Sequence, residues 1–222
     1  MKRSGIALSL MIALINPVFA QSEAGAIFLL IAPGARAGGM GEAQVAVADD
    51  AYASYWNPAG LSSLKKNEIL LDHQDWILDV DLDFVGASFK TPFGTIGAAI
   101  CAMYMGEMEV TTTHNPEGTG EKFSAGSIMG QLTFSRSLTD RFSFGVTAKV
   151  VRESIYNSKA NGFALDLGTL YNTQIPGLTM GMSISNYGSK MRYDGIDLIN
   201  PIDILENENE KFECSFLPSL LT

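Results

Sequence analysis

Two acidic stretches contain the side chains best suited to bind a metal ion. The stretch 72–75 places His73 between carboxylates, and Asp79, Asp81 and Asp83 alternate shortly after it. A carboxylate and an imidazole at short spacing can share one ion. However, no second histidine stands nearby in the sequence, and hydrophobic residues follow the acids where a calcium loop requires glycine. We therefore interpret 72–75 as a polar strand end and Asp79, Asp81 and Asp83 as three acids on the water-facing side of a strand, and we predict no metal site.

Two other motifs resemble enzyme signatures, and each fails at one position. Gly39-Met40-Gly41 begins like a dinucleotide fingerprint, but Gln44 stands where the third glycine belongs. The stretch 181–185 lacks the final glycine of a nucleophile elbow and lies within an alternating strand pattern. The sequence offers no Ser/His/acid set, phosphate loop or paired carboxylates. We predict that the protein is not an enzyme and uses no cofactor.

A third candidate is the stretch 48–61, ADDAYASYWNPAGL, which concentrates carboxylates and aromatic rings. Asp49 or Asp50 can cap the N-terminus of a short helix. The aromatic residues from 52 to 56 are spaced to share one face of that helix. Asn57 precedes a proline and so leaves the helical region, after which a turn follows. We expect a compact helix ahead of the first strand.

The N-terminus has the pattern of a secretory signal. Lys2 and Arg3 precede an apolar run over residues 6–15, and Ala20 offers a cleavage site. We therefore expect residues 1–20 to be removed on export. Gln21 follows the cleavage site, and no cysteine there indicates lipid attachment.

Charge and cysteine content limit the partners. The net charge of −9 becomes more negative once the signal is removed, so nucleic acid is not expected to bind. Cys101 and Cys214 are too few for a disulfide framework. A single bridge between them is neither indicated nor excluded.

The elements that must position these residues are strands. From Phe142 to Val150 apolar side chains alternate with Ser, Gly, Thr and Lys, which is the period of a half-buried strand. The same design recurs, and we expect seven strands between residues 69 and 186. The joints alternate between short turns and longer polar stretches, at 111–122 and 157–161. A parity change at Phe84 and Val85 predicts a β-bulge.

Both a soluble sandwich and a membrane barrel would alternate in this way. The polar face here is Ser, Thr, Gly and Gln with few charges, and the segments reach about ten residues, enough to cross a bilayer when tilted. Aromatic residues gather at segment ends, as in the girdles of membrane barrels. The pattern favours an antiparallel up-and-down transmembrane β-barrel, with the soluble sandwich as the alternative.

Two stretches carry a resemblance to a known family. Residues 24–41, AGAIFLLIAPGARAGGMG, run on through the aromatic stretch to Leu61, and residues 177–192 contain GLTMGMSISNYG followed by KMR. Both are similar to the PorV/PorQ family of bacterial outer-membrane proteins, relatives of the FadL-type channels for hydrophobic compounds. The second stretch resembles a strand of this family that ends in an Asn-x-Gly turn.

The resemblance implies an all-β fold: a fourteen-stranded barrel whose N-terminal segment folds inward as a hatch. It divides the mature chain into a hatch with a short helix at 21–66 and a β-meander at 67–222. Seven strands cannot enclose a plug, and bacterial barrels have an even number of strands. We therefore expect a chain truncated to about half of its barrel.

The resemblance also implies function. The first expectation is an outer-membrane component of type IX secretion, with secreted proteins or the secretion machinery as partners. The alternatives are a FadL-like passive channel for hydrophobic small molecules and a secreted structural β protein. Outer-membrane lipid would surround the barrel. We expect the hatch, structural or gating, to depend on Gly34, Arg36, Gly41, Asp49, Asp50, Trp56, Asn57, Pro58 and Gly60, and the lumen to be lined by Gln131, Thr147, Lys149 and Asp166.

Overall fold

The computed structural model describes residues 24–195, 213–216 and 219–221. The predicted secretory signal at 1–20 lies outside the described residues. None of the helices in the described part has the length and apolar character needed to cross a membrane.

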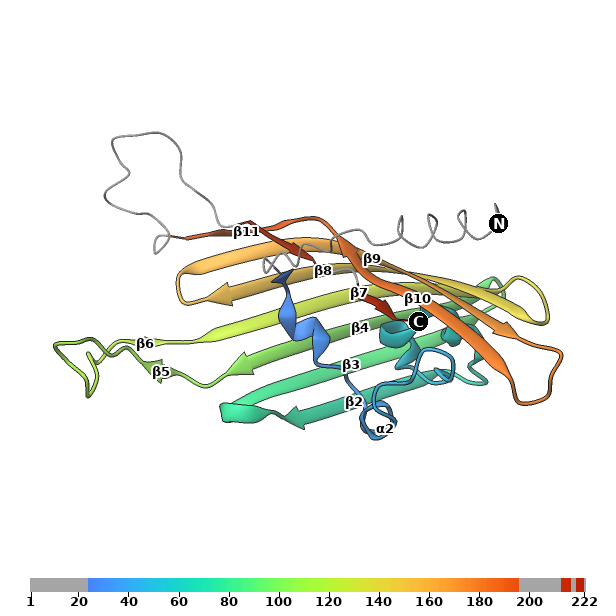
Figure 1. The fold of residues 1–222 in the computed structure, drawn as a ribbon, viewed down its shortest axis with the longest axis horizontal. Coiled ribbons are helices and arrows are strands. Elements are labelled where there is room, and N and C mark those ends of the chain that lie inside the picture. Colours follow the sequence, from blue (N-terminus) through green and yellow to red (C-terminus); the bar gives the residue numbers. More distant parts are fainter. Residues whose placement is uncertain (1–23, 196–212, 217–218, 222) are drawn as a thin grey trace, which may run out of the picture.

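Seven long strands form one antiparallel sheet in which neighbours in the chain are neighbours in space (Figure 1). This confirms the all-β, up-and-down fold and the seven strands expected from the alternation. Short turns join most of these strands, and glycine, proline or aspartate stands at the joints 92–93, 138–141 and 173–178. The strands are β2 (Glu68–Asp75), β3 (Val80–Thr91), β4 (Gly94–Met105), β7 (Ala125–Ser137), β8 (Phe142–Ile155), β9 (Ser158–Asn172) and β10 (Thr179–Gly188).

Shorter strands extend this arrangement. A separate two-stranded sheet of β5 (Met108–Glu109) and β6 (Lys122–Phe123) lies in the connection between β4 and β7. β11 (Met191–Asp194) pairs with β9 and with β12 (Glu213–Phe216), and β13 (Ser219–Leu221) pairs with β10. β1 (Ala24–Gly25) adds a parallel pair to β12.

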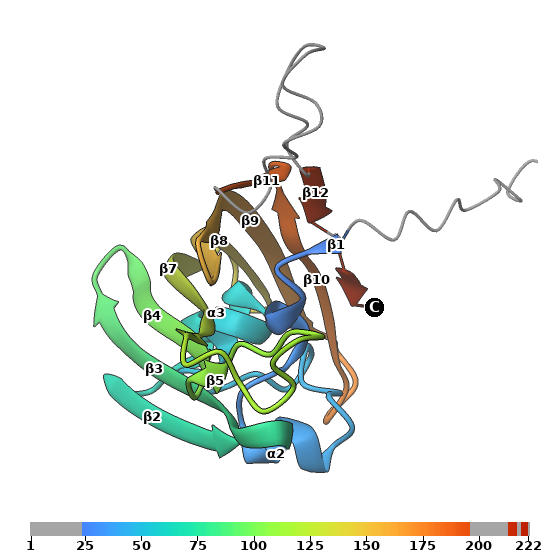
Figure 2. The same ribbon diagram turned by 90° about the vertical axis from the view of Figure 1, so that its left-hand side faces the viewer.

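The sheet is strongly curved, and the N-terminal segment, residues 26–64, lies on its concave side (Figure 2). Within the described part the sheet does not close, and β2 forms one of its free edges. The segment contains η1 (Ile27–Leu30), α2 (Ala35–Gly39), α3 (Ala53–Trp56) and η2 (Pro58–Ser63), and a further turn, η3 (Ile77–Asp79), joins β2 to β3.

Alternation along each strand separates two faces with different surroundings. Inward side chains pack against the N-terminal segment, and the core includes Phe28, Trp56, Leu61, Phe84 and Met129. Many outward side chains are large, apolar and exposed, as a lipid-facing surface requires. They include Ile69, Leu71, Val85, Phe89, Ile96, Ile100, Ile128, Leu132, Phe134, Phe144, Val150, Phe163, Leu165, Leu167, Met180 and Met182.

The β-bulge predicted at Phe84 and Val85 is wrong. β3 pairs with both neighbours in continuous register. The apolar pattern changes parity because Phe84 faces inward against Tyr52 and Tyr55, whereas Val85 faces outward. The strand therefore keeps its inward and outward positions throughout, and apolar side chains occupy the inward face first and the outward face afterwards.

Two other local predictions also differ from the structure. The polar stretch 157–161 is not a loop, because β9 begins at Ser158 and its small residues Ser158 and Ala160 are buried inward. The Asn-x-Gly turn expected at Asn186 is instead an irregularity inside β10. There the register with β9 shifts between Ile184 and Tyr187, and Asn186 takes a left-handed φ of 57°. This bulge turns the Asn186 side chain inward.

Candidate functional site

The site is the interface between the N-terminal segment and the concave face of the sheet. Two glycines of adjacent strands, Gly145 and Gly168, face the segment where the chain passes through Asn57 and Pro58. A Cβ on Gly145 would overlap the backbone of Pro58, and one on Gly168 would overlap the Asn57 side chain. Glycine within a strand commonly marks such a close approach of another backbone.

The glycine contacts continue on either side of this point. A Cβ on Gly97 of β4 would lie 2.7 Å from Leu61 Cδ1, and one on Gly181 of β10 would lie 2.7 Å from Ala46 Cα. Gly60, within the segment, has no room for a side chain because it lies against the Ala48 carbonyl. The segment therefore lies so close to four strands of the sheet that no side chain fits between them at these glycines.

Asn57 ties the segment both to itself and to the sheet. Its side-chain NH₂ donates to the Val45 carbonyl at 2.9 Å and to the Thr169 carbonyl at 3.0 Å. Its Oδ1 accepts from the Ala59 N–H at 3.1 Å and so caps η2, with Pro58 at the first helical position. Asn57 is fully buried, so each of these bonds replaces one to water.

Replacing Asn57 with alanine should lower the free energy of unfolding by about 3 kcal/mol, because it removes three hydrogen bonds, including the buried ones to the Val45 carbonyl and from the Ala59 N–H. Asn67→Ala is the matched control, since the Asn67 side chain accepts one exposed bond from Lys90 N–H. Urea unfolding of the detergent-solubilised protein measures both. Equal losses would show that Asn57 does not hold the segment.

Trp56 and Tyr55 fix the part of the segment that precedes the helix. Trp56 Nε1 donates to the Pro33 carbonyl at 3.3 Å, and the Tyr55 hydroxyl donates to the Leu29 carbonyl at 2.5 Å. Both rings are buried and meet edge to face at 5.5 Å. Buried aromatic rings with satisfied polar atoms give a rigid anchor.

Lys149 and Asp166 form a buried ion pair beneath the segment. Lys149 Nζ lies 2.6 Å from Asp166 Oδ2, donates to Asn186 Oδ1 at 2.9 Å, and stands 5.3 Å from the centre of the Tyr55 ring. Asp166 Oδ1 accepts from the Asn186 N–H at 2.7 Å. Both charged side chains are at most 1% exposed. The pair connects β8, β9 and the bulge of β10 to the N-terminal segment.

Gln131 and Thr147 also face the segment. Gln131 Nε2 donates to Ser54 Oγ at 3.0 Å, and Thr147 Oγ1 donates to the Ser54 carbonyl at 3.4 Å. All four side chains predicted to line a lumen, Gln131, Thr147, Lys149 and Asp166, thus point to the concave side, where the N-terminal segment covers them.

The acidic residues predicted to cap the short helix act differently. Asp49 pairs instead with Arg36 at 2.6 Å in an exposed contact, which also raises the pKa of Arg36. Exposed pairs of this kind contribute little to stability. Asp50 accepts from the Tyr52 N–H at 3.0 Å, just before α3, and partial burial raises the pKa of its carboxyl. Neither carboxylate caps α3, whose N-cap residue is Tyr52.

Gly34 and Gly41 have backbone angles that favour glycine. Gly34 has a φ of 103°, and its N–H donates to Asp72 Oδ2 at 2.9 Å, joining the segment to the edge strand β2. Burial, followed by the charge of Asp72, raises the pKa of the neighbouring Tyr52 to about 12. Gly41 has a φ of 62°, and a Cβ there would have no neighbour within 4 Å. The turns before α3 therefore depend on glycine for their backbone angles.

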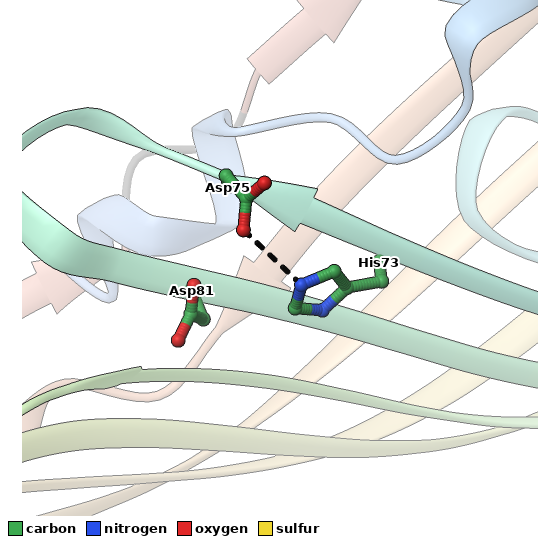
Figure 3. A group of neighbouring side chains, drawn as sticks. All are labelled: His73, Asp75 and Asp81. Atoms are coloured by element: carbon green, nitrogen blue, oxygen red, sulfur yellow. Dashed lines mark hydrogen bonds and ion pairs between the residues drawn. The ribbon is translucent and has the colours of Figure 1, made fainter.

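The fold brings the two acidic stretches of the sequence together on the outward face of the β2–β3 hairpin. His73 lies between Asp75 and Asp83, with Nε2 3.2 Å from Asp75 Oδ1 and Nδ1 2.7 Å from Asp83 Oδ1. One ligand atom each from His73, Asp75 and Asp81 lies within 4.8 Å of the others (Figure 3). The turn reverses the chain so that these residues become cross-strand neighbours.

A curved, open antiparallel sheet with an apolar outer face and an N-terminal segment packed on its inner face has the architecture of one side of a plugged barrel. Residues 20–205 match the family described as type IX secretion system protein PorV. The chain belongs to this family, as the two sequence stretches suggested. Comparison with curated proteins and with solved structures gave no match.

Proposed function

We propose that this protein is an outer-membrane component of type IX secretion that receives exported proteins and passes them to the surface attachment machinery. Membership of the PorV family is the observation that carries this proposal. The apolar outward face of the sheet supports contact with outer-membrane lipid. The signal-like sequence at 1–20 supports export from the cytoplasm.

The N-terminal region 21–66 would act as a hatch seated on the meander 67–222. Because the hatch packs closely on the strand glycines, moving it as a unit would expose the apolar and aromatic core between the segment and the sheet to water. The free-energy cost of that exposure favours a fixed plug that serves docking over a gate that opens with each transport event.

Deleting the gene in its source bacterium and measuring the surface-attached secretome tests the secretion role. We expect exported proteins to be lost from the cell surface and to return when the wild-type gene is supplied. Supplying the Gly145→Ala gene, whose hatch should not seat, should restore them only in part. An unchanged secretome in the deletion strain would refute the proposal.

The channel alternative is tested in the same strains. A cavity of about 320 Å³ lies between the N-terminal segment and the strands, with Phe28, Ile31, Met103, Ile155 and Glu153 among its walls. Because the fixed plug blocks a path beyond this cavity, we expect uptake of alkanes and fatty acids to be equal with and without the gene. Reduced uptake in the deletion strain would favour a channel for hydrophobic solutes.

Lysine substitutions along one strand test the lipid-facing assignment. Leu165 lies at the centre of β9 and faces outward, so Leu165→Lys should cost about 2–4 kcal/mol at the bilayer midplane. Tyr171 lies at the end of the same strand, where Tyr171→Lys should cost about 0–1 kcal/mol. Unfolding of the protein reconstituted in lipid measures both. Equal costs at the two positions would contradict the assignment.

A further inference from the structure

Three acids and one histidine occupy the outward face of the β2–β3 hairpin in two cross-strand pairs. The register places His73 opposite Asp83 and Asp75 opposite Asp81. Two carboxylates directly opposite each other destabilise a strand pair by repulsion. The hairpin nevertheless lies at the free edge of the sheet in the described part, where β2 has a strand on one side only. A cation between these carboxylates would remove the repulsion.

The orientation of His73 is fixed in the way that metal-binding histidines are fixed. Asp83 Oδ1 lies 2.7 Å from His73 Nδ1, and the Tyr104 hydroxyl donates to Asp83 Oδ2 at 2.9 Å. A carboxylate that holds one ring nitrogen and leaves the other for the ion is the usual second layer of a metal site. Here the other nitrogen, Nε2, points at Asp75.

Asp75 supplies a second ligand atom beside the imidazole ring. Its Oδ1 lies 3.2 Å from His73 Nε2, the ring nitrogen that Asp83 does not hold. The Asp81 carboxylate comes within 4.8 Å of both ligand atoms, which supplies a third donor from the facing strand.

We propose that His73, Asp75 and Asp81 bind one divalent transition-metal ion, with Asp83 as the positioning residue behind His73. Ligand distances of about 2.0–2.2 Å require only that exposed side chains converge from their present separation. One imidazole and two carboxylates suit zinc or manganese better than calcium or magnesium, which prefer oxygen ligands alone. The ion would clamp the edge hairpin, with water in its remaining positions.

Manganese is the most informative probe, because pulsed electron paramagnetic resonance detects an imidazole nitrogen bound to it. The full chain is purified in detergent, stripped with chelator and titrated with Mn²⁺. We expect a bound ion with nitrogen coupling that disappears in His73→Gln. Asp83→Asn should weaken binding about 10- to 100-fold, as loss of a second-layer partner does elsewhere. Zinc should displace the manganese.

The control is His114→Gln, which alters the other histidine of the chain, exposed in the connection between β5 and β6. It should leave the nitrogen coupling and the affinity unchanged. The fluorescence of the buried Trp56 confirms that each variant is folded. Absence of Mn²⁺ binding, or coupling that persists in His73→Gln, would overturn the proposal and leave His73 as a protonated partner of its two acids.

Discussion

Lys149→Met should lower the free energy of unfolding by about 3–5 kcal/mol, because it leaves the Asp166 carboxylate buried without its counter-charge. Asp166 is fully buried, and its other protein contact is the backbone N–H of Asn186. Methionine preserves most of the length of the lysine stem, so the loss reports the charge and not a cavity. Urea unfolding in detergent, followed by the fluorescence of the buried Trp56 and of Trp76, measures the loss.

A second substitution at the partner separates charge from packing. Lys149→Met combined with Asp166→Asn removes both charges and keeps an oxygen that can accept from Asn186 N–H. The double variant should regain most of the lost stability, since a neutral buried pair carries no large desolvation penalty. Lys159→Met, at an exposed position of β9, should change little. A double variant as unstable as the single one would contradict an ion-pair origin.

Gly145→Ala should prevent the N-terminal segment from seating, since even the single added carbon overlaps the backbone of Pro58 and Ala59. Backbone cannot move aside as the end of a flexible side chain can. We therefore expect a cost at or above the upper end of the usual range for overpacking, about 3 kcal/mol. Limited proteolysis should then cleave within residues 26–64, which we expect to stay intact in the wild type.

Gly130→Ala on β7 is the matched control. Gly130 faces outward, and a Cβ there would meet Val150 Cγ2 at 3.6 Å, an ordinary van der Waals distance. This variant should resist protease like the wild type. If Gly145→Ala is equally resistant and equally stable, the close approach of the segment to the strand glycines does not hold the site together.

The strands were predictable because one local rule governs them. An antiparallel sheet with different surroundings on its two faces imposes a period of two, which is visible in any strand such as β8. The predicted bulge was wrong because contacts with a distant segment, and not the strand's own sequence, decide which face is apolar at this point. Phe84 is inward and apolar because the aromatic rings of the N-terminal segment pack on it, and no local pattern contains that information.

The site was predictable only in its components. Trp56, Asn57 and Gly60 stood out as a compact motif, and Lys149 and Asp166 as charges on the inner face. That these two charges pair depends on the register between β8 and β9 and on the bulge at Asn186. Glycine within a strand can mark the close approach of another backbone, but Gly145 and Gly168 also fit the alternating pattern as small residues of the polar face. The pattern therefore did not single them out.

The hairpin cluster was missed for a related reason. His73 and Asp83 are ten residues apart, and their contact depends on a turn in which Leu78 and Asp79 have left-handed φ angles of 58° and 55°. Aspartate tolerates a positive φ, but leucine rarely adopts one, so the sequence offers little sign of this turn. The sequence therefore offers no sign that these residues meet, although the hairpin brings them together.

Hydrogen–deuterium exchange of the purified full chain tests most directly whether the N-terminal segment is a fixed plug. The N–H groups of Asn57, Ala59 and Gly60 donate to buried acceptors within the segment. They should exchange as slowly as the central amides of β7 and β8, because releasing them requires lifting the segment from the sheet. Exchange as fast as in the connection 106–121 would contradict the account and make the segment a mobile gate.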